Sequence, residues 1–274
     1  MGPLVQPGWV ASQPDLLLFD ATFYLASEQR DALAEFHQAH LPGAQFFDVG
    51  AIADPATTLP HMVPSAGRFE HLMRALGVSN TSRVVFYDQK GVATAPRGWW
   101  LMDLFGHDQV AVLDGGLPAW VAAGLPTERG DPAPRPPGSF TSRLRALRLR
   151  GLGDMLAATP RDTLVIDARS AARFHGTEPE PRPGLPGGHI PGARNIPSST
   201  VASSGHLLPP DQLRTLFSQA GDDGTRPVVT TCGSGVTATV LTFARTVAGL
   251  PPGAVYDGSW TEWALTPGTP KEIG

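Results

Sequence analysis

The sequence VVTTCGSGVTAT, residues 228–239, lies where an apolar strand pattern gives way to a helical one. Apolar residues at 227–229 precede the turn, and residues 237–248 carry apolar side chains at helical spacing. The two glycines of the turn can adopt positive φ angles without steric cost. Such a turn can aim backbone N–H groups at one point near a helix N-terminus. The stretch therefore predicts a strand–turn–helix unit whose loop binds an anion at Cys232.

An earlier stretch, VVFYDQKGVATA at residues 84–95, repeats this pattern 144 residues upstream (228 minus 84). Both copies begin with a Val-Val pair, and both carry Gly-Val seven residues later. Three further pairs follow the same order: Phe19-Asp20-Ala21 with Ile166-Asp167-Ala168, HLPGA at 40–44 with HIPGA at 189–193, and LDGGLPAW at 113–120 with YDGSWTEW at 256–263. The chain is therefore predicted to contain two copies of one structural unit.

Residues 125–140 contain five prolines, and a Pro-rich segment is extended and stiff. We interpret them as a linker between domains at 1–124 and 141–274. In both domains, short apolar strand patterns alternate with helical ones, which predicts a mostly parallel sheet with helices on both faces. The expected strands are 16–19, 84–86, 111–113, 164–166 and 227–229. The expected helices are 27–39, 68–76, 93–105, 211–220 and 237–248.

The composition excludes several classes of function. The formal charge is −4 and the pI is near 6.0, which argues against nucleic-acid or anionic-membrane partners. No apolar run approaches a membrane span, and the N-terminus lacks a secretory pattern. The single cysteine excludes an internal disulfide framework and a multi-cysteine zinc site. We expect a cytoplasmic protein without a cofactor or a metal, in which His37 and His40 are solvated rather than metal ligands.

Cys232 is the expected nucleophile. A lone cysteine is often a small buried hydrophobe, but a packing cysteine needs no glycine-rich cradle. The first copy has Asp88 at the equivalent position, and a carboxylate cannot carry sulfur. We therefore expect the N-terminal domain to be catalytically silent. A phosphatase would need an arginine six residues after the cysteine, and Ala238 stands there instead.

With these motifs, the sequence resembles the two-domain rhodanese-type sulfurtransferases, and among them the 3-mercaptopyruvate sulfurtransferases. The resemblance covers nearly the whole chain. It rests on FFD (46–48), HM-x-P (61–64), APRGWW (95–100), FGH (105–107), RFHGTEPEPRPG (173–184), GHIPGARNIP (188–197), CGSGVTA (232–238) and YDGSWTEW (256–263).

The resemblance implies an enzyme that takes sulfur from 3-mercaptopyruvate, holds it as a persulfide on Cys232 and releases pyruvate. A thiol acceptor such as thioredoxin or a small thiol, or cyanide, would then remove the sulfur. The alternative donor is thiosulfate, with the same nucleophile. A non-enzymatic sulfur carrier that serves one protein acceptor is a further alternative. The N–H groups expected to hold the persulfide belong to Gly233, Ser234, Gly235, Val236 and Thr237.

The resemblance also implies roles for four side chains outside the cysteine. Arg173 and Arg182 match arginines that bind the donor carboxylate, a task that suits the planar guanidinium fork. Their alternative roles are solvation at the surface or structural ion pairing with Glu178 or Glu180. Ser234 and His61 match a pair that relays a proton to the pyruvate enolate. In that family an acidic residue usually stands where this chain has Gly50, which leaves the carboxylate that would orient His61 undetermined.

Overall fold

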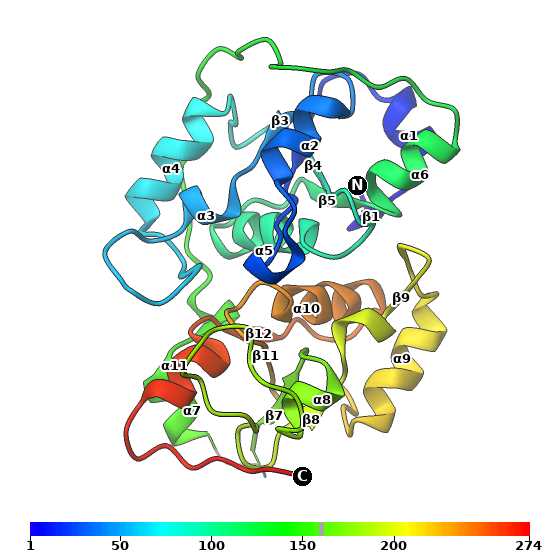
Figure 1. The fold of residues 1–274 in the computed structure, drawn as a ribbon. Helices are drawn as coiled ribbons and strands as arrows, with labels where there is room; N and C mark the ends of the chain where they lie inside the picture. The colour runs from blue at the N-terminus through cyan, green and yellow to red at the C-terminus, as the bar shows by residue number, and fades with distance from the viewer. Residues whose placement is uncertain (159–161) are drawn as a thin grey trace. The chain divides into compact units, whose positions relative to one another are not determined.

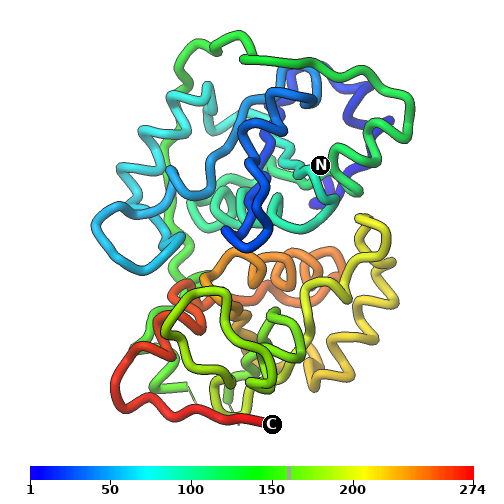
Figure 2. The backbone as a smooth tube through the Cα atoms, in the orientation of Figure 1, coloured from blue at the N-terminus to red at the C-terminus, as the bar shows by residue number. Residues whose placement is uncertain are grey.

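The computed structural model describes residues 1–158 and 162–274, which divide into two compact units. Unit 1 comprises Met1–Pro55, Val63–Arg145 and Ser204–Leu207, and unit 2 comprises Ala56–Met62, Ala146–Ser203 and Leu208–Gly274. The segment 125–145 is traced without long helices in Figure 2 and belongs to unit 1. Residues 56–62 group with unit 2, although they precede most of unit 1 in the sequence. The predicted boundaries at 124 and 141 remain a prediction.

Unit 1 is built on a parallel sheet with the strand order β1-β5-β4-β2-β3. Its strands are β1 (Leu4–Val5), β2 (Leu16–Asp20), β3 (Gln45–Phe46), β4 (Arg83–Tyr87) and β5 (Val110–Leu113). Its helices are α1 (Pro7–Ser12), α2 (Ala32–Gln38), α3 (Val49–Ile52), α4 (Ala66–Ala75), α5 (Ala95–Leu104) and α6 (Gly116–Ala122), with a short turn η1 at Ala26–Glu28.

Alternation along the buried strands places helices on both faces of this sheet. Leu18 and Val85 pack in a cluster that includes residues of α1, α2 and α6. Phe86, the next residue along β4, points to the other face, where α5 covers it. A Cβ added at Gly98 of α5 would collide with the Phe86 ring, so the close approach of helix and strand requires a glycine there.

Unit 2 repeats this design with the parallel order β6-β12-β11-β7-β8. Its strands are β6 (Leu149–Arg150), β7 (Leu164–Asp167), β8 (Arg194–Asn195), β11 (Val228–Thr231) and β12 (Ala254–Tyr256). Its helices are α7 (Leu152–Ala157), α8 (Ala171–Phe174), α9 (Pro210–Gln219), α10 (Ala238–Val247) and α11 (Ser259–Leu265). Its short elements are η2 (Ala146–Arg148), η3 (Ser198–Thr200) and β9 (Ala202–Ser203), and β9 pairs with β10 (His206–Leu207), which belongs to unit 1.

The two faces of the unit 2 sheet are also both covered. Helix α10 contacts α9, β11 and β12 (Figure 1). Thr242 of α10 shares a side-chain hydrogen bond with Thr230 of β11. Val229, on the opposite face of β11, packs in a cluster with residues of α7, α8 and α11. The predicted fold class is therefore confirmed in both copies.

The sequence located the central strands more accurately than the edges. The five predicted strands overlap β2, β4, β5, β7 and β11. The unpredicted strands β1, β3 and β8 are two residues long, too short for a periodic signal. Helix α2 begins at Ala32 rather than at 27, because Asp31 caps it by accepting a hydrogen bond from the N–H of Ala34.

The expectation that His40 is solvated was wrong. Its side chain is buried, stacks on Phe36 and bonds to the Phe36 carbonyl through Nδ1 at 2.9 Å. His189, its counterpart in the second copy, stacks on Phe174 and bonds to that carbonyl in the same way. The histidine of the repeated H-x-P-G-A motif is thus a packing residue in both copies.

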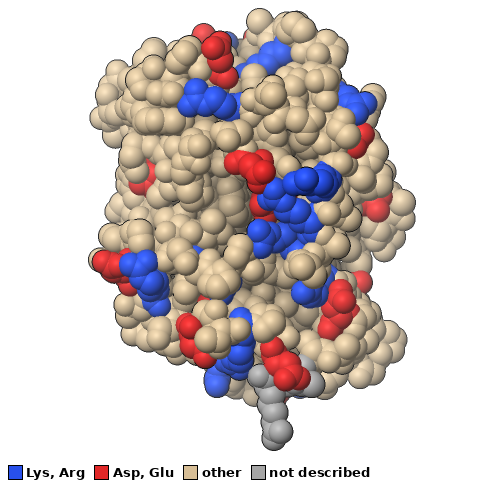
Figure 3. All heavy atoms as spheres, turned by 180° about the vertical axis from the view of Figure 1, so that it is seen from behind, with Lys and Arg blue, Asp and Glu red and all other residues tan. Residues whose placement is uncertain are grey.

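In the part of the chain that the structure describes, no helix has the length and apolar character needed to cross a bilayer. On the face drawn in Figure 3, most atoms belong to uncharged residues, and basic side chains lie beside acidic ones. This surface matches the low content of charged residues, 17% of the chain.

Replacing Asp20 with asparagine is expected to change how stability depends on pH. Burial raises the pKa of the Asp20 carboxyl from 3.8 to about 6, although hydrogen bonds from Thr22 and Gln89 oppose the shift. The native state therefore binds more protons than the unfolded state between about pH 4 and pH 6, and stability falls as the pH rises through that window. This decrease in the free energy of unfolding amounts to about 3 kcal/mol, and it should be absent in Asp20→Asn.

Urea unfolding of both proteins at pH 4, 6 and 8 measures this difference. The free energies of unfolding should converge at low pH and diverge above pH 6, with the variant the more stable protein there. Parallel pH profiles for the two proteins would contradict the assignment to Asp20.

Candidate active site

The site lies at the carboxyl ends of the unit 2 strands, where β11 ends at Thr231 and α10 begins at Ala238. Cys232 is the first residue of the intervening loop and is 2% exposed. Gly235 has φ +81°, which a residue with a side chain would adopt only with strain. Gly233 is not in that region, contrary to the expectation for both glycines. A Cβ there would lie 2.9 Å from Nη2 of Arg173, so the guanidinium end would have to shift to admit a side chain.

The equivalent loop of unit 1, which follows Asp88, shows which group such a loop binds. We call each of these two loops a cradle. Both carboxylate oxygens of the fully buried Asp88 accept hydrogen bonds from the loop that follows it. Oδ1 accepts from the N–H of Lys90 at 2.9 Å. Oδ2 accepts from the N–H groups of Ala93, Thr94 and Ala95 at 2.8–2.9 Å. The first cradle therefore binds an anion, and this anion is the carboxylate of Asp88.

The cradle of unit 2 lacks such a carboxylate. Within residues 1–158 and 162–274, no acceptor bonds to the N–H groups of Ser234, Val236 or Thr237. A persulfide on Cys232 would place its outer sulfur three bonds from Cα, the same number as the Asp88 carboxylate oxygens. The second loop can thus hold a charged sulfur where the first holds oxygen.

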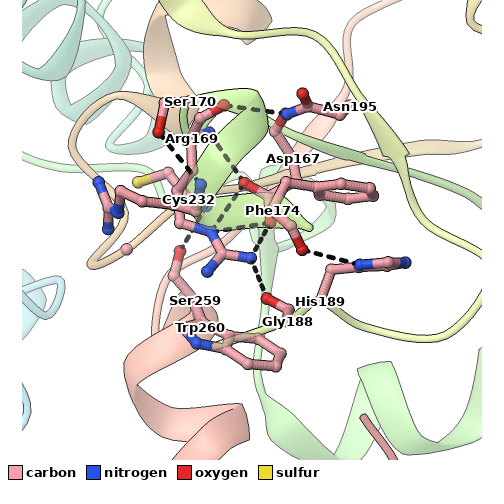
Figure 4. Close-up of polar contacts among 12 residues, drawn as sticks. Asp167, Arg169, Ser170, Phe174, Gly188, His189, Asn195, Cys232, Ser259 and Trp260 are labelled. Atoms are coloured by element: carbon pink, nitrogen blue, oxygen red, sulfur yellow. Dashed lines mark hydrogen bonds and ion pairs between the residues drawn. The ribbon is translucent and has the colours of Figure 1, made fainter. Parts of the chain in front are cut away.

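A chain of ion pairs runs beside this loop, and Figure 4 shows its first pair, Asp167 with Arg169. Arg169 is bonded through Nη2 to Asp167 at 2.6 Å and through Nη1 to Glu180 at 2.7 Å. Glu180 in turn binds Nη2 of Arg173 at 2.5 Å, and its side chain is only 2% exposed. Arg169 also lies over the ring of Trp260, 4.7 Å from the ring centroid. These contacts fix the Arg173 guanidinium next to the loop at Gly233.

The geometry of Arg173 is compatible with both of its expected roles. It forms the ion pair with Glu180, and it also lies against the cysteine loop, where a donor would bind. Arg182 differs. Burial lowers the pKa of its guanidinium below the usual value, while the nearby Cys232 opposes that shift. Among the described residues, no carboxylate forms an ion pair with Arg182. Arg182 is thus a half-buried cation within electrostatic range of both Cys232 and Glu180.

Ser234 and His61 are brought together. Nδ1 of His61 lies 3.0 Å from Oγ of Ser234, and both residues belong to unit 2. His61 holds φ at +59°, an uncommon conformation for a residue with a side chain. Asp48 is engaged elsewhere, because its Oδ1 caps helix α3 by accepting from the N–H groups of Gly50 and Ala51.

Sequence reasoning did not identify Arg169 as part of this site. The signal was present in the comparison of the two copies. Asp20 and Asp167 are equivalent, but two residues later the first copy has Thr22 and the second has Arg169. The buried carboxylate is therefore bonded to a hydroxyl in unit 1 and to a guanidinium in unit 2.

The chain matches the family model described as a rhodanese-like domain twice, over residues 12–123 and 151–266. It is 42% identical to a protein of Rattus norvegicus named 3-mercaptopyruvate sulfurtransferase, over 96% of this chain and 92% of the relative. It is 39% identical to thiosulfate/3-mercaptopyruvate sulfurtransferase 1, mitochondrial, of Arabidopsis thaliana, over 98% of this chain and 78% of that protein. The crystal structure of SseA from Escherichia coli, described among 3-mercaptopyruvate sulfotransferases, superposes with a TM-score of 0.86 at 34% identity, covering 95% of this chain and 99% of SseA.

Proposed function

Because this chain belongs to the rhodanese-like family and carries two copies of its domain, we propose that it transfers sulfur from 3-mercaptopyruvate to a thiol through a persulfide on Cys232. The observation that carries the proposal is the pair of cradles. One is filled by the Asp88 carboxylate, and in the equivalent loop after Cys232 the N–H groups of Ser234, Val236 and Thr237 have no acceptor among the described residues. In this proposal unit 1 is catalytically silent.

The first half-reaction forms the persulfide. The Cys232 thiolate attacks the sulfur of 3-mercaptopyruvate, and an S–S bond forms as the C–S bond breaks. The electron pair of the C–S bond remains on the departing carbon, so pyruvate leaves as its enolate. The N–H groups of residues 233–237 stabilise the negative charge on the new persulfide.

Two arginines orient the donor. The half-buried guanidinium of Arg182 is proposed to bind the carboxylate, and Arg173 lies against the loop, where it can contact the keto acid. The pair formed by Ser234 and His61 can deliver the proton that converts the enolate to pyruvate, because a hydrogen bond already joins them.

In the second half-reaction, an acceptor thiolate attacks the outer sulfur, the S–S bond breaks, and the Cys232 thiolate is restored. A thiol acceptor follows from the family in general, and a small thiol, cyanide or thioredoxin is our proposal for its identity. A reducing compartment such as the cytoplasm suits the free Cys232 thiol.

The loop favours 3-mercaptopyruvate over thiosulfate. Thiosulfate is a dianion, and a loop made for it would gain from cations next to the cysteine. Gly233 and Ser234 supply none, and a side chain at position 233 would displace the guanidinium end of Arg173.

Steady-state kinetics with each donor test the proposal. We expect pyruvate release in the presence of a thiol, and a kcat/KM for 3-mercaptopyruvate well above that for thiosulfate. A higher value for thiosulfate would instead support the alternative donor. Absence of turnover with both, together with sulfur transfer to a single protein acceptor, would identify a carrier.

A further inference from the structure

The first residues of helix α11 hold the backbone of the cysteine loop through four hydrogen bonds, all within unit 2 (Figure 4 shows the one from Cys232). Oγ of Ser259 accepts from the N–H of Cys232 at 3.2 Å. The N–H of Trp260 donates to the Cys232 carbonyl at 2.9 Å. The carbonyl of Gly233 accepts twice from Thr261, from its N–H at 3.1 Å and from its Oγ1 at 2.6 Å.

These bonds determine which way the loop amides point. In a trans peptide, the C=O and the following N–H point in opposite directions. A Cys232 carbonyl fixed on α11 therefore turns the N–H of Gly233 away from α11, and a fixed Gly233 carbonyl does the same for the N–H of Ser234. Without such restraint, peptides beside a glycine reorient at low cost. A reversed peptide would present a carbonyl oxygen, which repels an anion, where the cradle needs an N–H.

The first copy lacks most of this arrangement. Its counterpart of α11 begins with Gly116, Leu117 and Pro118 in the places of Ser259, Trp260 and Thr261. Only the bond from the Leu117 N–H to the Asp88 carbonyl is retained, at 3.0 Å. Glycine offers no hydroxyl, and proline has no N–H.

Ser259 also keeps a backbone conformation that favours glycine. Its φ is +51°, close to the +55° of Gly116 in the first copy. A serine in this region is strained relative to glycine. Its hydroxyl is fully used, since it accepts from Cys232 and donates to the Tyr256 carbonyl at 2.7 Å.

We infer that Ser259 and Thr261 are positioning residues that orient the Gly233 and Ser234 amides toward the sulfur of Cys232, a device found only in the copy that carries the cysteine. The inference deepens the proposed function and rests on it.

Two variants at position 259 separate positioning from stability. Ser259→Ala keeps the strain and loses the hydroxyl, whereas Ser259→Gly loses both. The glycine variant should therefore melt at a higher temperature than the alanine variant. Both should nevertheless lose kcat equally, by about tenfold or more, with KM changed less than about twofold. Activity that recovers together with melting temperature in Ser259→Gly would overturn the inference.

Thr266, the residue that caps the C-terminus of helix α11, supplies a matched control for position 261. Thr261→Val removes the hydroxyl bond to Gly233, and Thr261→Ser restores it. Thr266→Val removes a similar hydroxyl bond, to the Glu262 carbonyl, that does not touch the loop. We expect a shorter persulfide lifetime, followed by intact mass, only in Thr261→Val. Equal lifetimes in the two valine variants would contradict a positioning role.

A second readout does not depend on the donor. The rate of Cys232 alkylation by iodoacetamide should fall about tenfold in Ser259→Gly at fixed pH. If the unaltered protein forms no persulfide but the alkylation rates still differ as expected, the proposed function fails while the positioning inference stands. Unchanged alkylation rates would refute the positioning inference itself.

Discussion

Cys232→Asp is expected to abolish sulfur transfer while leaving the protein folded and at least as stable as the unaltered chain. The new carboxylate would occupy the cradle as Asp88 does in unit 1, where it accepts from four backbone N–H groups. Because the nucleophile is lost, the rate of pyruvate release should fall by at least about 10⁴-fold. Pyruvate assays and thermal melting measure the two effects.

Cys232→Ser is the matched control, since it removes the nucleophile without filling the cradle. It should be as inactive as Cys232→Asp but should melt at a lower temperature. If Cys232→Asp were instead strongly destabilised, the two cradles would not be equivalent, and the argument from Asp88 would fail.

Arg182→Ala is expected to lower kcat/KM for 3-mercaptopyruvate by about a hundredfold. A hydrogen bond to a charged group contributes about 1.5–3 kcal/mol, and each 1.4 kcal/mol corresponds to a factor of ten. The carboxylate is present in the ground state and in the transition state, so most of the loss should appear in KM. Donor kinetics with 3-mercaptopyruvate at saturating thiol provide the measurement.

Two further variants sharpen this test. Arg182→Lys keeps the charge but not the planar fork, so it should recover only part of the loss. Arg194→Ala removes an exposed arginine from β8 and should leave the kinetics unchanged. An Arg182→Ala enzyme with an unaltered KM would remove this residue from the donor site.

The architecture could be predicted well from the sequence because each of the two copies carries the same strand and helix pattern. Buried parallel strands give continuous apolar runs, and the repeat of Val-Val before Asp88 and before Cys232 aligned the two loops. The edge strands escaped prediction because two residues, as in Leu4–Val5, carry no period. His40 was misjudged because its burial depends on stacking against Phe36, which a sequence pattern does not reveal.

The site residues whose chemistry requires a particular side chain could be predicted from the sequence. Those whose role depends on the geometry of the folded backbone could not. Cys232 could be singled out from its glycine-rich context alone, and the family resemblance added Arg173 and Arg182. The bonds from Ser259 and Thr261 could not be foreseen, because they depend on how helix α11 meets a loop some 27 residues earlier. The ion pair of Glu180 with Arg173 was foreseen only as an alternative to donor binding.

The most direct test of the account is the mass of the intact protein after brief exposure to 3-mercaptopyruvate without a thiol. The account predicts a gain equal to one sulfur atom, located on Cys232 by peptide mapping and lost when a thiol is added. Pyruvate released while Cys232 stays unmodified throughout, or an added sulfur that no thiol removes, would contradict it.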